Sequence, residues 1–142
     1  GGVYLGGTGA ANHLDDYEEG TWTPVQSFAV PGTSSFAINV ASYTKIGRSV
    51  TIIYYVVISK GTATGTYSLA GLPFALVGTQ RCSGSVLWDG AGGTALYQTL
   101  DVVGTEINVN LQPQSTAYGG RTDASQVNAN SYLRMSLTYT TA

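Results

Sequence analysis

Apolar and polar side chains alternate one by one along several stretches of this chain. In the segment 106–111 Ile, Val and Leu alternate with Glu and Asn, and the segment 132–139 carries Leu, Met, Leu and Tyr at its odd-numbered positions. Because successive side chains of a β-strand point to opposite faces, this period of two places one face on a core and the other in water. The pattern therefore predicts half-buried β-strands.

Strand patterns of this kind, each bounded by Gly, Pro, Asn or Asp, recur along the whole chain after Gly20. No segment has the longer period of a helix, apart from one short turn discussed below. Many short strands without helices are typical of sandwiches and jelly rolls, so we expect an all-β, jelly-roll-like antiparallel β-sandwich. The predicted strands are 21–30, 35–44, 49–59, 66–70, 80–88, 94–102, 106–112 and 132–140.

The segment 51–58 departs from simple alternation because it carries large apolar side chains on both faces. One set can face the sandwich core, but the second set, which comprises Ile53, Tyr55 and Val57, needs another cover. At about 25 cal/mol per Å² of apolar surface, leaving that face in water would forfeit several kcal/mol and favour aggregation. Our hypothesis is that a neighbouring subunit covers it. The alternative is a central strand covered by loops of the same chain.

Composition supports one folded domain with a neutral surface. The chain has 142 residues, of which 43% are hydrophobic and 10% are charged, against about 25% charged in ordinary domains. A chain of this length can bury roughly two-thirds of its unfolded surface. The hydrophobic content contradicts the signature of disordered chains, so the chain is expected to fold. Because charged residues are few, Thr, Ser, Asn and Gly must form most of the surface.

The charge balance excludes two classes of partner. The net charge is −2 and the six basic residues are scattered, so no stripe for phosphate contacts exists and nucleic-acid binding is not expected. A polybasic attachment to a membrane fails for the same reason, and the longest apolar run is too short to span a bilayer. Cys82 is the only cysteine, which excludes an intrachain disulfide and a cysteine-based zinc site.

Half of the acidic residues lie in the run 12–24, before the first long strand. Asp15 can cap a single helical turn with Glu18 reaching back, and a glycine ends that turn before Trp22. We expect Trp22 to pack back on Leu14 and Tyr17. The sequence thus predicts an N-terminal arm and hinge turn over residues 1–20 and a β-sandwich domain over 21–142.

The run also resembles a junction of bacteriophage tail fibres and tailspikes, in which a Leu-Asp-Asp-Tyr-Glu-Glu-Gly-Thr-Trp-Thr-Pro string introduces a C-terminal β module. Here the string spans 14–24, and two later landmarks, Tyr-Thr-Lys-Ile-Gly at 43–47 and Gly-Leu-Pro-Phe at 71–74, are similar to those of the same module. The resemblance covers the N-terminal half and leaves the part after Arg81 open. It implies a homotrimer, a place at the tip of a virion fibre or spike, and upstream domains in the same chain. The chain begins with Gly rather than Met, so we expect it to be the end of a longer protein.

Two stretches carry the residue types that bind sugars, namely aromatic faces for stacking and polar groups for hydroxyls. The first is a strand end and Gly-rich loop with Trp88, Asp89 and Tyr97, and the second is a polar connection with Tyr118, Arg121 and Asp123. Each has a plainer interpretation. Trp88 can be a core residue, Asp89 part of a turn, and the Arg and Asp of the second stretch a surface ion pair.

Enzymatic and metal chemistry find little support. The four carboxylates at 15, 16, 18 and 19 lack the spacing of a calcium loop, and their adjacency is no sign of the separated pair that a glycosidase needs. His13 is the sole histidine and no Gly-x-Ser-x-Gly elbow accompanies it. We expect no metal, no cofactor and no catalytic residue.

The leading hypothesis is a trimerising and receptor-binding module that contacts bacterial surface polysaccharide. Two alternatives stay open. One is a glycan-cleaving domain, a depolymerase or esterase, whose active residues converge only in three dimensions. The other is a purely structural trimerisation domain without a ligand.

Overall fold

The computed structural model describes residues 2–10, 13–14, 16–78, 81–91, 95–103, 106–113 and 122–141. These residues form an antiparallel all-β structure, so the predicted fold class is confirmed. The elements are β1 (Val3–Tyr4), β2 (His13–Leu14), β3 (Tyr17–Thr21), β4 (Val25–Val30), β5 (Ser35–Ile46), β6 (Ser49–Ser59), β7 (Thr64–Ala70), β8 (Arg81–Ala91), β9 (Ala95–Val103), β10 (Glu106–Pro113), the 3₁₀ turn η2 (Ala124–Gln126) and β11 (Val127–Thr140).

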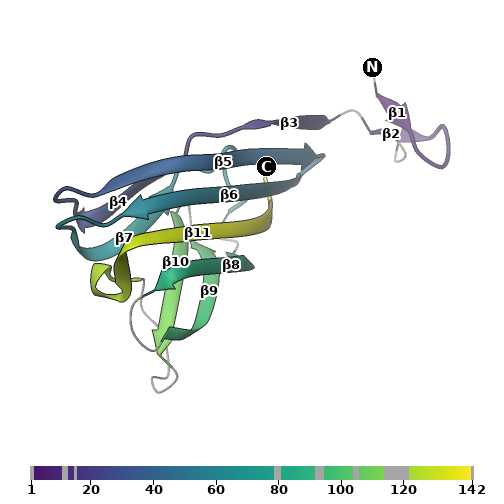
Figure 1. Cartoon of the computed structure of the whole chain (residues 1–142). Helices are drawn as coiled ribbons and strands as arrows, with labels where there is room; N and C mark the ends of the chain where they lie inside the picture. The colour runs from purple at the N-terminus through teal and green to yellow at the C-terminus, as the bar shows by residue number, and fades with distance from the viewer. Residues whose placement is uncertain are drawn as a thin grey trace.

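Nine strands form one continuous sheet in the order β3-β5-β6-β11-β8-β9-β10-β7-β4. The sheet folds over on itself, so that β4 and β7 lie behind β5 and β6 (Figure 1). β8 makes the change of layer possible, because residues 81–84 pair with β9 whereas residues 84–91 pair with β11. The small β1-β2 hairpin projects from the end of the body that β3 reaches.

Aromatic contacts between strands that are far apart in the sheet order show that the layers enclose a core. Phe28 of β4 stacks on Phe36 of β5 at a ring distance of 6.1 Å, and Tyr67 of β7 meets Trp88 of β8 edge-on at 5.2 Å. Neither pair belongs to neighbouring strands, so these rings meet across the sandwich. The inward residues of β6 and β11 fill the rest of this core: Val50, Ile52, Tyr54, Val56, Ile58, Leu133, Met135, Leu137 and Tyr139.

The predicted helical turn at 15–20 is wrong. Tyr17–Thr21 is a strand that pairs with β5 from Tyr17 opposite Ile46 to Thr21 opposite Ser42. The reason is tertiary, because β5 has an open edge whose backbone groups need partners, and the junction supplies them. Asp15, the proposed cap, lies outside the described residues. Residues 17–20 are therefore part of the main sheet.

Trp22 anchors in the core and not on the arm, which corrects the packing predicted from the sequence. Its side chain is 7% exposed and its ring lies 5.6 Å from that of Tyr54, while Tyr17 is 57% exposed. Five residues of extended chain span roughly 16 Å, which is too far for the two rings to meet. The backbone N–H of Trp22 donates to the carbonyl of Ala41, so β5 holds this residue in place.

Candidate functional site

The outer face of the β5-β6-β11-β8 layer, on the side away from the core, carries the second apolar set. In-register pairs define it: Val40 lies opposite Tyr55, Tyr55 opposite Arg134, and Arg134 opposite Leu87. We call this surface the outer face. Ile53 and Leu87 are each 51% exposed on it, so strands of the same chain leave these side chains uncovered.

A β-bulge in β5 places the side chain of Val40 on the outer face. The register between β5 and β6 shifts between Ile38 and Val40, which inserts one extra residue into β5. Before the shift Phe36 faces the core, and after it Val40 stands on the outer face beside Tyr55. Since strand side chains alternate, one inserted residue exchanges the faces of everything that follows.

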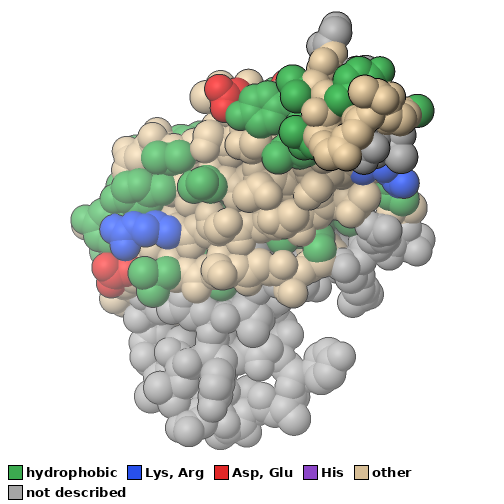
Figure 2. All heavy atoms as spheres, turned by 90° about the vertical axis from the view of Figure 1, so that its right-hand side faces the viewer, with side chains coloured by type: hydrophobic (Ala, Val, Ile, Leu, Met, Phe, Trp, Pro, Cys, Tyr) green, Lys and Arg blue, Asp and Glu red, His purple; other side chains and the backbone are tan. Residues whose placement is uncertain are grey.

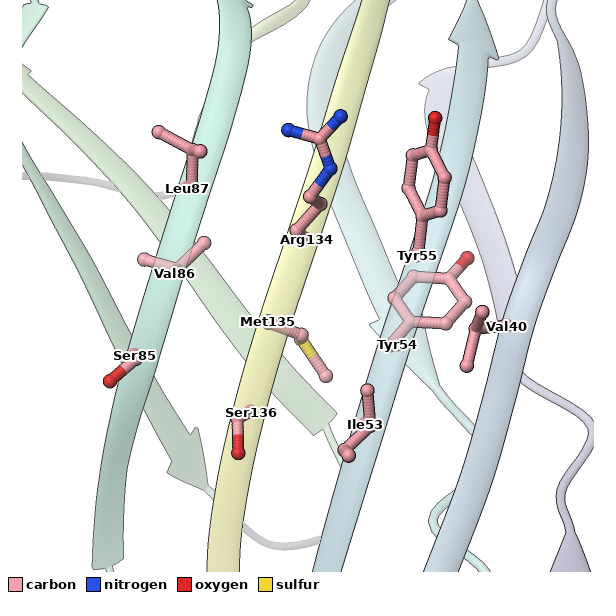
Figure 3. Close-up of a pocket in the computed structure, with 10 residues that line it drawn as sticks. All are labelled: Val40, Ile53, Tyr54, Tyr55, Ser85, Val86, Leu87, Arg134, Met135 and Ser136. Carbon is pink, nitrogen blue, oxygen red and sulfur yellow. The ribbon is translucent and has the colours of Figure 1, made fainter.

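The outer face is hollowed by a shallow groove of about 370 Å³ between β5 and β8 (Figure 3). Its outward-pointing walls are mostly apolar, with two serine hydroxyls at one end. The guanidinium carbon of Arg134 lies 4.9 Å from the centre of the Tyr55 ring, a cation–π contact. The groove is lined by Val40, Ile53, Tyr54, Tyr55, Ser85, Val86, Leu87, Arg134, Met135 and Ser136.

The predicted interface residues Ile53, Tyr55 and Val57 all project from the outer face of β6. The residues between them on the strand are buried in the core, as the two-sided pattern indicated. Leu87 and Arg134 also belong to this surface and were missed from the sequence. Their outward alternation was visible, but nothing in the sequence paired their strands with β6.

Of the six predicted sugar-binding residues, the structure describes the side chains of Trp88, Asp89 and Asp123, and the first two lie on opposite faces of β8. Trp88 is 2% exposed and packs against Tyr67, so its ring is not accessible for stacking on a sugar, and the plainer interpretation as a core residue is correct. Asp89 is exposed on the outer face opposite Tyr132. Tyr97 lies in β9 and pairs with Gln112, and its side chain is outside the description. Tyr118 and Arg121 fall outside the described residues.

Asp123 caps the 3₁₀ turn η2. Its carboxylate accepts a hydrogen bond of 2.9 Å from the Ser125 N–H, and the Gln126 side chain accepts one of 2.8 Å from the Asp123 N–H, forming a capping box for η2. Hydrogen bonding from Ser125 to this carboxylate lowers the pKa of Asp123 below its usual value. The residue also bridges to Thr66 of β7.

Three segments far apart in the sequence meet at the base of β3, in a group we call the junction cluster. Asp16 forms an ion pair with Lys45, Glu18 accepts a hydrogen bond from the Tyr43 hydroxyl, and both β5 side chains lie against Phe74. The Tyr43 and Phe74 rings meet edge-on at 5.2 Å, and the Lys45 ammonium lies 5.6 Å from the Phe74 ring centre. The hydrogen bond to Glu18 raises the pKa of the Tyr43 phenol.

Gly20 gives the junction cluster its close packing. A Cβ at this position would lie 3.0 Å from the Tyr43 hydroxyl and 3.1 Å from its ring. A neighbouring pair on the other face of β3 is exposed, where the hydroxyl of Tyr17 donates to Glu19 at 2.8 Å and this hydrogen bond raises the pKa of Tyr17. The junction therefore ties its carboxylates to tyrosines and a lysine of the sheet.

On the side of the molecule drawn in Figure 2, charged side chains are few among the described residues, and hydrophobic side chains are exposed on the projecting arm. Val3, Tyr4 and Leu5 are between 51% and 61% exposed there. Among the described residues, no three His, Cys, Asp or Glu side chains stand close enough to share a metal ion. The same residues contain no helix with the length and apolarity to cross a bilayer.

Comparisons with protein-family models, with curated proteins and with solved structures found no match.

Proposed function

We propose that this chain is the C-terminal module of a bacteriophage tail fibre or tailspike, which self-associates through its outer face as a homotrimer and contacts bacterial surface polysaccharide. In this proposal the module forms the tip of the virion fibre and continues from upstream domains of the same chain. The observation that carries it is the uncovered apolar outer face around Ile53, Tyr55 and Leu87.

Energetics favour a cover for this face. Fully burying a large apolar side chain contributes about 1.5–3 kcal/mol, so covering the exposed halves of Ile53 and Leu87 would contribute roughly 1 kcal/mol each. Association costs about 4–15 kcal/mol in lost freedom of motion, so those two residues alone cannot hold an assembly together. The contact must extend over the whole outer face, including Val40 and Tyr132, which are each 39% exposed.

The junction cluster supports the resemblance to phage fibre modules. The three motifs that carry the resemblance are separated by 18 residues (25–42) and 23 residues (48–70) in the sequence. In the fold their side chains form one connected series of contacts, in which Asp16 pairs with Lys45, Glu18 bonds to Tyr43, and both Lys45 and Tyr43 lie against Phe74. A shared packing unit is a physical reason for the three motifs to occur together.

Sedimentation equilibrium tests the assembly. We expect a mass of three chains for the protein and a weaker association for Ile53→Asn, which places an amide in the apolar groove. Val30→Asn is the matched control, because Val30 is 56% exposed but lies on β4 in the other layer. A protein that stays monomeric at the highest attainable concentration would refute the proposal.

The burial of Trp88 favours a second candidate, a trimerisation module without a ligand, because it removes one of the aromatic platforms for a sugar. Glycan arrays and adsorption to host cells distinguish the two. Binding that is lost on replacing Tyr118 or Arg121 supports the adhesive module, and an absence of binding to any surface glycan supports the structural one.

A further inference from the structure

Among its described side chains, the outer face carries two charged groups of opposite sign close to the groove. Arg134 stands in the middle of the groove wall, on β11. Asp89 stands on β8, two residues beyond Leu87, and is exposed. In a chain with 10% charged residues, a cation and a carboxylate on one largely apolar surface call for an explanation.

The two charges do not pair with each other within the chain. Arg134 lies opposite Leu87 and Asp89 opposite Tyr132, so they are diagonal neighbours, whose Cα atoms are typically about 7–8 Å apart. The guanidinium extends along β11 between Leu87 and Tyr55 (Figure 3), and its central carbon lies 4.9 Å from the centre of the Tyr55 ring. Within the described part of the chain, neither Arg134 nor Asp89 takes part in an ion pair.

A partner that covers the groove must supply a hydrogen-bond acceptor for the Arg134 guanidinium. Burying a guanidinium under apolar atoms without an acceptor costs several kcal/mol, so the covering surface has to bring a carboxylate or another anion. The apolar walls favour a protein surface over a sugar, whose hydroxyls need many polar partners. An identical copy offers such a surface, with the exposed Asp89 at its edge.

Closed rings of identical copies need complementary sides. In a head-to-tail ring each copy presents one side of its face to one neighbour and the other side to the next. The outer face has this asymmetry, since its cation stands on β11 in contact with Tyr55 of β6, and its carboxylate stands on β8, the other neighbour of β11.

We propose that, in the assembly, the Arg134 guanidinium of one copy pairs with the Asp89 carboxylate of the next copy across the groove. This inference rests on the proposed self-association through the outer face. The pair would set the register of the copies, while the apolar residues around Ile53 and Leu87 supply most of the buried area.

A charge-reversal cycle tests the pair. The association constants of the wild type, Arg134→Glu, Asp89→Lys and the double variant are measured by sedimentation equilibrium at one ionic strength, with circular dichroism to check folding. Each single reversal should weaken association at least about tenfold per interface, as close charge pairs in protein complexes couple by about 1.5 kcal/mol or more. The double variant restores opposite charges and should return to within about threefold of the wild type.

Lys60→Glu provides a control for net charge, because Lys60 follows β6 and lies outside the groove. If the wild type assembles but the losses of the two single variants simply multiply in the double variant, the pair is refuted and self-association stands. If the wild type does not assemble, both proposals fall. If Arg134→Glu leaves association unchanged and instead abolishes binding of a trigalacturonate probe, Arg134 serves an acidic sugar and the inference is overturned.

Discussion

Removing the carboxylate of Asp16 should destabilise the protein because it leaves the Lys45 ammonium without its partner. The Lys45 side chain is 11% exposed, whereas that of Asp16 is 51% exposed. Breaking a fully buried ion pair from one side costs about 3–5 kcal/mol, and an exposed pair contributes about 0–1 kcal/mol. Water reaches Asp16, so we expect Asp16→Ala to lower the free energy of unfolding by about 1–2 kcal/mol.

The structure also predicts how this loss depends on Lys45. Methionine at position 45 removes the charge but keeps an unbranched apolar stem near the Phe74 ring, 5.6 Å from the present ammonium. In a Lys45→Met background no buried charge is left to be stranded, so Asp16→Ala should cost less than about 0.5 kcal/mol. The double variant should be close in stability to Lys45→Met alone.

Urea unfolding of the four proteins, followed by tryptophan fluorescence, measures this coupling. Protein concentration must be the same in all samples, because self-association would shift the apparent stability. Glu19→Ala is the matched control, since Glu19 lies on the same strand but is exposed and bonds only to the Tyr17 hydroxyl among the described residues. An equal cost of Asp16→Ala in both backgrounds would contradict the role assigned to the junction cluster.

Three further outcomes follow from buried or constrained positions. Trp22→Ala should lower the free energy of unfolding by about 3–5 kcal/mol, because loss of the indole, which is 7% exposed, leaves a cavity in the core. An unchanged midpoint in a urea titration would refute the anchoring of Trp22 in the core. Gly90→Ala should lower the free energy of unfolding by about 1–3 kcal/mol, since the φ of Gly90 is +83° and the added Cβ would lie 2.8 Å from the carbonyl oxygen of Asn130. Thermal unfolding measures this loss, and a wild-type melting temperature would contradict that geometry. Tyr139 is buried with its hydroxyl donating to the Phe74 carbonyl at 3.1 Å, and burial raises its pKa to about 12. The unfolded phenol loses its proton near pH 10, before the folded one, so stability should fall as pH rises from 10 towards 12, and Tyr139→Phe should flatten that slope in alkaline titrations.

The period-two pattern predicted most of the strands because it reports burial, which is a local property of each strand. The strands found at β5 to β10 lie within a few residues of the expected segments, and β6 has the two apolar faces that its sequence indicated. The pattern failed at the junction, where Tyr17–Thr21 pairs with β5 instead of forming a turn. A capping signal competes weakly with a complete row of backbone hydrogen bonds offered by an open strand edge.

The amino-acid sequence by itself therefore determined the all-β class, the strand positions and the existence of a surplus apolar face, since each follows from residue type and spacing. Only the tertiary structure decided which residues share that face. Arg134 and Leu87 join Tyr55 through pairing between strands that are distant in the chain, and Val40 joins them through a bulge in β5. Strand order and register depend on how all strands pack together, and that packing also turned Trp88 into the core and away from any sugar.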